Sequence, residues 1–139
     1  MKMRSLLIPL LAVLLLAVPA KAQDKTPDEL KAEKELREFV DNELEKLTSQ
    51  LKLEYWQEFL VDSIMTHDYQ AITEEFNKYK KEKISNTDEY YKVQDKWNDK
   101  MYYAIEAILN KDQKALFAKT AMAKAKKQRD KKKAKEAGL

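Results

Sequence analysis

The chain contains almost none of the residues that form tight turns. Gly138 is the only glycine among 139 residues, and Pro27 is the only proline after residue 22. Tight β-hairpin turns depend strongly on glycine, so a sheet built from them is disfavoured. Apolar side chains instead recur at helical spacing along nearly the whole chain after residue 26. The sequence therefore predicts an all-α protein.

The first 22 residues have the composition of a secretory signal peptide. Two basic side chains precede an apolar run from Leu6 to Val18, which is shorter than the roughly 20 residues that span a bilayer. Residues 20–22, Ala-Lys-Ala, give the small-x-small pattern that signal peptidase needs. We expect cleavage after Ala22, or alternatively after Ala20, and export to the periplasm. No cysteine follows the run, which excludes a lipoprotein anchor.

Cleavage leaves a helical domain, residues 23–123, and a basic Lys/Ala-rich tail, residues 124–139. Three of the 27 basic residues lie in the signal and all 24 acidic residues lie after it, so the mature formal charge is zero. The tail carries +6 and the domain −6. A neutral mature chain gives no indication of nucleic-acid binding. We predict a frayed, solvated tail whose charge attracts acidic clients or an anionic membrane.

Residue types that carry chemistry are few. The chain has no cysteine and one histidine, His67, and it lacks a G-x-S-x-G or glycine-rich phosphate motif. Ser63 lies four residues before His67, but the spacing places no acid to orient the imidazole. A zinc site needs three or four ligands, and only Asp62 or Asp68 could join His67. We therefore predict no enzyme activity, no metal and no cofactor, with His67 half-buried and structural.

Four helices are predicted from their caps and periodicity. The first begins at Pro27, where Thr26 and Glu29 can form a capping box, and ends near Leu51. The others cover about 53–83, 87–108 (after a capping box of Asn86 and Glu89) and 111–122. The first half of the second helix is apolar nearly all round. We expect it to be covered on several sides, as a central helix or a dimer core.

Two of the predicted helix starts share one pattern. Residues 53–57, LEYWQ, open the second helix and residues 109–113, LNKDQ, open the fourth. Both fit L-x-x-x-Q, in which the second residue is the N-cap and the glutamine closes a capping box. The leucine before the cap docks on the core. The motif residues are Leu53, Gln57, Leu109, Asn110 and Gln113.

In an exported, cysteine-free, four-helix chain, this pattern resembles the LTXXQ-motif family of periplasmic helical proteins, the Spy/CpxP-like family. The likeness covers roughly residues 30–120, and Glu54 and Asn110 stand where the family has threonine. The resemblance implies a thin, curved layer of helical hairpins that forms an antiparallel dimer. It also implies a concave face that binds unfolded clients or a sensor domain.

Aromatic doublets mark the candidate binding surface. Neighbours on a helix point about 100° apart, so one ring of a doublet can pack inward while the other faces solvent or a partner. Packing of both rings is the alternative. We predict a homodimer buried partly through Trp56, Phe59 and Leu60, and a client surface centred on Tyr103. The full candidate surface comprises Tyr55, Trp56, Phe59, Leu60, Tyr91, Tyr102 and Tyr103.

Together these features favour binding over catalysis. We expect a periplasmic binding protein of the envelope-stress type, which holds unfolded clients without ATP. The alternative is a helical adaptor or inhibitor that binds one fixed envelope partner, such as a sensor domain. A coiled-coil chaperone would need sustained heptads, which only the first helix approaches.

Overall fold

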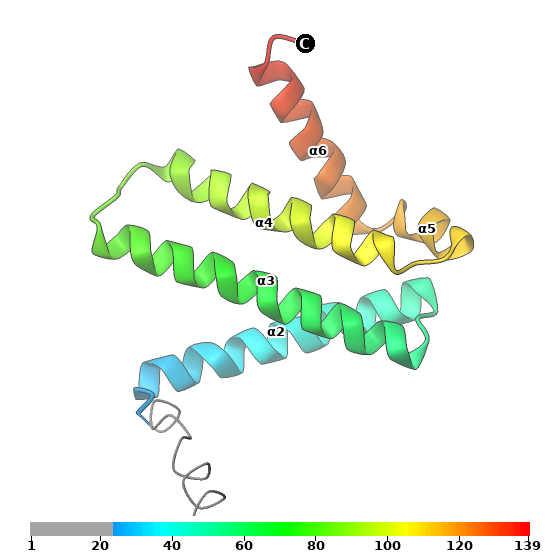
Figure 1. Cartoon of the computed structure of the whole chain (residues 1–139), viewed down its shortest axis with the longest axis horizontal. Coiled ribbons are helices and arrows are strands. Elements are labelled where there is room, and N and C mark those ends of the chain that lie inside the picture. The colour runs from blue at the N-terminus through cyan, green and yellow to red at the C-terminus, as the bar shows by residue number, and fades with distance from the viewer. Residues whose placement is uncertain (1–23) are drawn as a thin grey trace, which may run out of the picture. The chain divides into compact units, whose positions relative to one another are not determined.

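The computed structural model describes residues 24–139, and all regular structure in this range is helical. The predicted all-α class is therefore confirmed. The predicted signal peptide lies outside the described residues. No helix in residues 24–139 is long and apolar enough to cross a membrane. The helices are α2 Pro27–Leu51, α3 Tyr55–Lys81, α4 Thr87–Ala107, α5 Lys111–Phe117 and α6 Ala121–Glu136 (Figure 1).

The chain divides into two compact units, one ending at Glu33 and the other running from residue 34 to 139. In the described part of the first unit, Thr26 and Glu29 form the predicted capping box. The Thr26 N–H donates to Glu29 Oε2 at 2.9 Å, and the Glu29 N–H donates to Thr26 Oγ1 at 3.3 Å. Local sequence thus sets the start of α2.

The second unit is built around one apolar cluster. In α3, the buried side chains Val61, Met65 and Ile72 recur at helical spacing along one face. Helices α3 and α4 lie side by side and run in opposite directions (Figure 1). Helices α2 to α5 and the connections at Leu53 and Leu109 all contribute to the cluster. Its buried members are Val40, Leu47, Leu51, Leu53, Val61, Met65, Met101, Ile105, Leu109 and Phe117.

Two helix ends place a lysine where glycine is usual. Lys52 after α2 and Lys83 after α3 have φ values of 53° and 56°, in the left-handed region that costs a residue with a side chain about 1–2 kcal/mol. After Lys83, the Ile84 N–H donates to the Tyr79 carbonyl at 2.9 Å, which is the bond of a Schellman helix end. A similar bond follows Lys52. These bonds reverse the chain direction without glycine.

The predicted fourth helix is two helices, and the prediction of a frayed tail is wrong. Helix α5 ends at Phe117, and Thr120 caps α6 by accepting from the Ala123 N–H at 3.3 Å. The Thr120 hydroxyl also donates to the Phe117 carbonyl at 2.7 Å. A threonine cap therefore breaks a segment that has no glycine or proline. Ala123 and Lys126 are buried, while most of residues 127–139 are exposed, so α6 is a regular helix that packs through one face and is otherwise largely solvated.

Asn86 caps α4, but not through the predicted capping box. Its Oδ1 accepts from the Asp88 N–H at 3.0 Å. The Glu89 carboxylate, which was expected to reach back to Asn86, accepts from Lys92 at 2.8 Å instead. A lysine one turn along the helix therefore replaces the backbone N–H as the partner of Glu89.

Candidate binding surface

The two L-x-x-x-Q helix starts meet through their glutamines. Gln57 Nε2 donates to Gln113 Oε1 at 2.7 Å, and Gln113 Nε2 donates back to Gln57 Oε1 at 2.8 Å. Each Oε1 also accepts from the N-cap of its own helix, from the Glu54 N–H at 2.9 Å and the Asn110 N–H at 3.1 Å. Asn110 Oδ1 accepts from the Gln113 N–H at 2.8 Å. Both amides are buried, so each one locks the other in place.

Each amide also reaches the backbone that precedes the other helix. Gln57 Nε2 donates to the Ile108 carbonyl at 2.9 Å, and Gln113 Nε2 donates to the Lys52 carbonyl at 3.4 Å. The motif leucines, Leu53 and Leu109, are buried in the core beside this junction. The structure therefore gathers all five motif residues at one point, which fixes the starts of α3 and α5. The spacing within either motif does not encode this contact.

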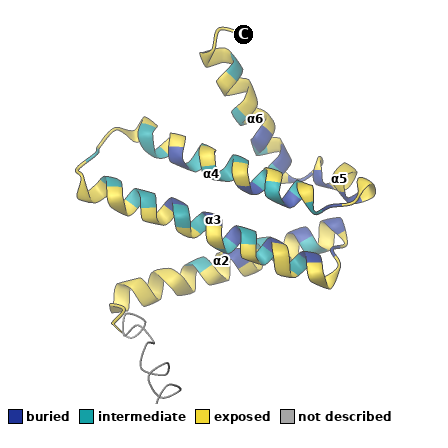
Figure 2. Cartoon of the chain, viewed as in Figure 1, coloured by how far each residue is buried: buried dark blue, intermediate teal, exposed yellow. Residues whose placement is uncertain are grey.

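The junction decides which face of α3 turns outward. Gln57 points inward and is 2% exposed. Tyr55 and Phe59 then lie on the opposite face of the first two turns and are 88% and 67% exposed, and Trp56, beside them, is 51% exposed. Figure 2 marks exposed residues along this part of the ribbon. Leu60 lies at the edge of this face and is 37% exposed. We call Tyr55, Trp56, Phe59 and Leu60 the aromatic patch.

The aromatic patch is apolar and uncovered in the described part of the chain. Trp56 Nε1 donates to Glu54 Oε2 at 2.6 Å, which holds the indole against the N-cap. The expected cover on several sides of this half-helix is therefore not supplied by residues 24–139. Contiguous exposed apolar side chains often mark binding surfaces.

The three α4 tyrosines of the predicted surface lie in different environments. Tyr102 is half-buried and its ring stacks on Phe117, with centroids 4.9 Å apart. It packs on the core and is not part of an open surface, which corrects its prediction as a client contact. Tyr91 and Tyr103 are exposed. Lys126 Nζ lies 5.0 Å from the Tyr103 ring centroid, and another α6 lysine lies 5.8 Å from that of Tyr91.

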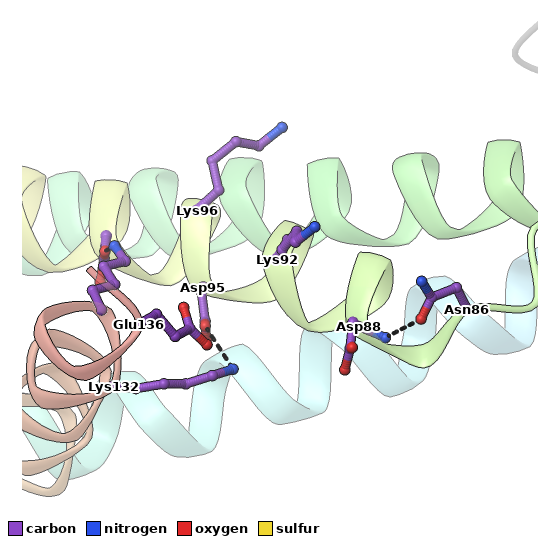
Figure 3. Close-up of a pocket in the computed structure, with 9 residues that line it drawn as sticks. Asn86, Asp88, Lys92, Asp95, Lys96, Lys132 and Glu136 are labelled. Atoms are coloured by element: carbon purple, nitrogen blue, oxygen red, sulfur yellow. Dashed lines mark hydrogen bonds and ion pairs between the residues drawn. The ribbon is translucent and has the colours of Figure 1, made fainter. Parts of the chain in front are cut away.

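Helix α6 is held along α4 mainly by charge. Asp99 Oδ1 accepts from Arg129 Nε at 2.7 Å, and its second oxygen pairs with Lys133. Burial alone would raise the pKa of the Asp99 carboxyl, but the hydrogen bonds from Lys133 and Arg129 outweigh it and hold that pKa below its ordinary value. Lys132 reaches Asp95 at 3.9 Å across a polar cleft between the helices (Figure 3). The sequence signal for this docking is an acidic pair at i, i+4 spacing, Asp95 and Asp99, and a basic pair at the same spacing, Arg129 and Lys133.

His67 is exposed, which corrects the predicted half-buried position. Its Nδ1 lies 2.8 Å from Asp68 Oδ1, so a carboxylate does contact the imidazole, contrary to the expectation from spacing. The Ser63 hydroxyl donates at 3.0 Å to a backbone carbonyl one turn earlier. Asp62 pairs with an arginine of α2 at 2.5 Å. Within residues 24–139, no group of three or more His, Cys, Asp or Glu side chains could hold a metal ion.

No model of a known protein family, no curated protein and no solved structure matches the chain. The resemblance to the LTXXQ-motif family therefore rests on the sequence pattern alone, and membership stays a prediction.

Proposed function

We propose that the chain is a periplasmic binding protein of the envelope-stress type, which holds unfolded clients without ATP. The observation that carries this proposal is the aromatic patch, whose three rings are each at least half exposed. Unfolded proteins expose apolar segments, and burying apolar area is favourable by about 25 cal/mol per Å² without any directional requirement. Tyrosine and tryptophan add large contact area at low entropic cost. Such a surface binds many sequences.

The charges beside the aromatic patch suggest which clients bind best. Glu54 and Glu58 lie in the first turn region of α3, next to the exposed rings. The domain that carries the patch has a formal charge of −6. Negative potential attracts positively charged partners and speeds their association. We therefore propose that preferred clients carry basic residues next to apolar segments.

The proposal also includes a dimer and a periplasmic location. Two copies pair in antiparallel fashion through Trp56, Phe59 and Leu60, forming the thin, curved layer of helical hairpins that the family resemblance implies. The exposure of these three side chains supports the pairing. Client and second copy compete for the same surface. The periplasmic address rests on the signal-like composition of residues 1–22.

An adaptor that binds one fixed envelope partner is the second candidate. The fixed position of Trp56 and of the helix start favours it. Trp56 is tied to Glu54 and the helix start is locked at Gln57, so the patch is shaped in advance, as a surface for one partner would be.

Aggregation suppression separates the two functions. The mature chain, residues 23–139, is mixed without nucleotide with each of two unrelated, chemically unfolded enzymes, and light scattering is followed. A client-holding protein suppresses scattering of both enzymes at near-equimolar ratio, and added ATP changes nothing. Suppression of neither enzyme, matching an inert protein at equal mass, would exclude client holding and leave the adaptor.

A further inference from the structure

Helix α6 sorts its basic side chains onto two faces. Arg129, Lys132 and Lys133 pair with aspartates of α4, and Lys126 pairs with Asp130 while lying over the Tyr103 ring. These four cations are used within the fold. The remaining four basic side chains are Lys124, Lys127, Lys131 and Lys135, which we call the outer lysine stripe.

The outer lysine stripe is continuous and carries only positive charge. Its members are spaced by three, four and four residues, which places them within a sector of about 80° and over about 16 Å of helix. All four are exposed, and none has an ion-pair partner among residues 24–139. The two carboxylates of α6 lie off the stripe, since Asp130 pairs with Lys126 and Glu136 lines the cleft toward α4 (Figure 3).

We propose that the outer lysine stripe docks the protein on an anionic phospholipid surface. Lysine is a compact point charge on a flexible stem, which suits a diffuse layer of headgroup phosphates, whereas the planar fork of arginine suits one fixed oxyanion. The only arginine of α6, Arg129, is used inward on Asp99. Helix α6 has no aromatic ring, so it offers nothing on which the bases of a single-stranded nucleic acid could stack.

The inner contacts hold the stripe in position for this docking. Because Arg129 and Lys133 fix one face of α6 to Asp99, the opposite face cannot turn toward the body and neutralise itself. Each lysine close to an anionic bilayer strengthens binding by about fivefold. The docking uses no residue of the aromatic patch, so it is independent of client holding.

Vesicle co-sedimentation tests the proposal on the whole mature chain. We compare the wild type with K124Q/K127Q/K131Q/K135Q and with a control, K80Q/K81Q/K111Q/K114Q, which removes the same charge from exposed lysines of α3 and α5. Vesicles contain phosphatidylglycerol in phosphatidylcholine, or phosphatidylcholine alone. We expect the stripe variant to lose at least about tenfold in affinity for the anionic vesicles, and the control to lose no more than about twofold. The proposal would be overturned if the stripe variant and the control lost affinity equally, or if the wild type bound equally well to both kinds of vesicle.

Two further arms keep the test decisive. The variant K124R/K127R/K131R/K135R keeps charge and helix propensity, and we expect it to bind anionic vesicles like the wild type. Loss of binding in this variant contradicts a purely electrostatic contact. Stripe-dependent binding to duplex DNA that is as tight per phosphate as binding to vesicles would assign the stripe to nucleic acid and overturn the membrane assignment.

Discussion

The side-chain amides of Gln57 and Gln113 donate to and accept from one another, at 2.7 Å and 2.8 Å, although the residues stand 56 positions apart. Each amide also serves the N-cap of its own helix. The start of α3, which carries the aromatic patch, is therefore held by the start of α5. A buried pair of this kind is stabilising only while both members are present.

The two glutamines should be energetically coupled. The stability lost when both are removed should be smaller than the sum of the losses in the two single variants. In Gln57→Leu, the Gln113 amide and the Glu54 N–H lose a partner in a buried site, and each unsatisfied group costs about 1–3 kcal/mol. In the double variant with Gln113→Leu, neither side-chain amide is left unpaired and the two N-cap N–H groups still lack a partner, so the total loss should be below the sum of the two single losses. Urea denaturation of all four proteins measures this. Gln70→Leu, at an exposed position, is the control, and additive losses would refute the coupling.

Asn110 tests the second motif as a helix cap. Its side chain accepts from the Gln113 N–H at 2.8 Å, so Asn110→Ala should lower the free energy of unfolding by about 1 kcal/mol. Asn110→Ser keeps an accepting oxygen at the cap and should be nearly neutral. Thermal melts of both variants give the comparison. Equal melting temperatures for Ala and Ser would show that the cap bond contributes nothing.

Local sequence predicted the helix starts better than the contacts between helices. Thr26 with Glu29 and Asn110 with Gln113 lie three residues apart, and their capping boxes form as expected. The cap at Thr120 was missed because Ala118 and Lys119, before it, are residues that helices tolerate well. Helix propensity alone therefore did not predict that a helix ends before Thr120.

Long-range partners could not be read from periodicity. The Gln57–Gln113 contact and the docking of Arg129 on Asp99 join residues 56 and 30 positions apart. The tail was predicted to be frayed because it has no apolar stripe. What packs it is charge complementarity with α4, which becomes visible only when the two helices are placed side by side. The exposure of Phe59 likewise depends on Gln57 being turned inward.

The docking of α6 should fail in acid. The pKa of Asp99 is lower in the fold than its ordinary value of about 3.9. Its contribution is therefore present above that value and is lost as pH falls through the lowered folded pKa. At neutral pH, Asp99→Asn should weaken docking by about 1.5–3 kcal/mol, the usual value for hydrogen bonds to a charged group. Hydrogen exchange of the α6 amides reports the detachment.

The control for this prediction is Asp24→Asn, which removes a carboxylate at an exposed position. Exchange in α6 should match the wild type in this variant. If the α6 amides of Asp99→Asn exchange no faster than those of the wild type at neutral pH, the ion pairs do not hold the helix.

If the dimer pairs through Phe59, a charged side chain at this position should dissociate it. Phe59 is 67% exposed within one chain, so Phe59→Asp should keep the helical content while burying a carboxylate in the interface. We expect a dimer mass for the wild type at micromolar concentration and a monomer mass for the variant, by sedimentation equilibrium. A monomeric wild type would rule out the dimer at that concentration.

If the aromatic patch holds unfolded clients, loss of one of its rings should weaken client holding more than loss of an exposed ring elsewhere. Phe59→Ser removes a ring of the patch, whereas Tyr91→Ser removes a ring of the wider surface predicted from the sequence, which lies outside the patch on α4 and is 52% exposed. Suppression of enzyme aggregation by light scattering should fall several-fold in Phe59→Ser, since its loss removes about 2 kcal/mol of apolar burial. Tyr91→Ser should protect like the wild type. Equal protection by both variants, with unchanged helicity, would contradict the account.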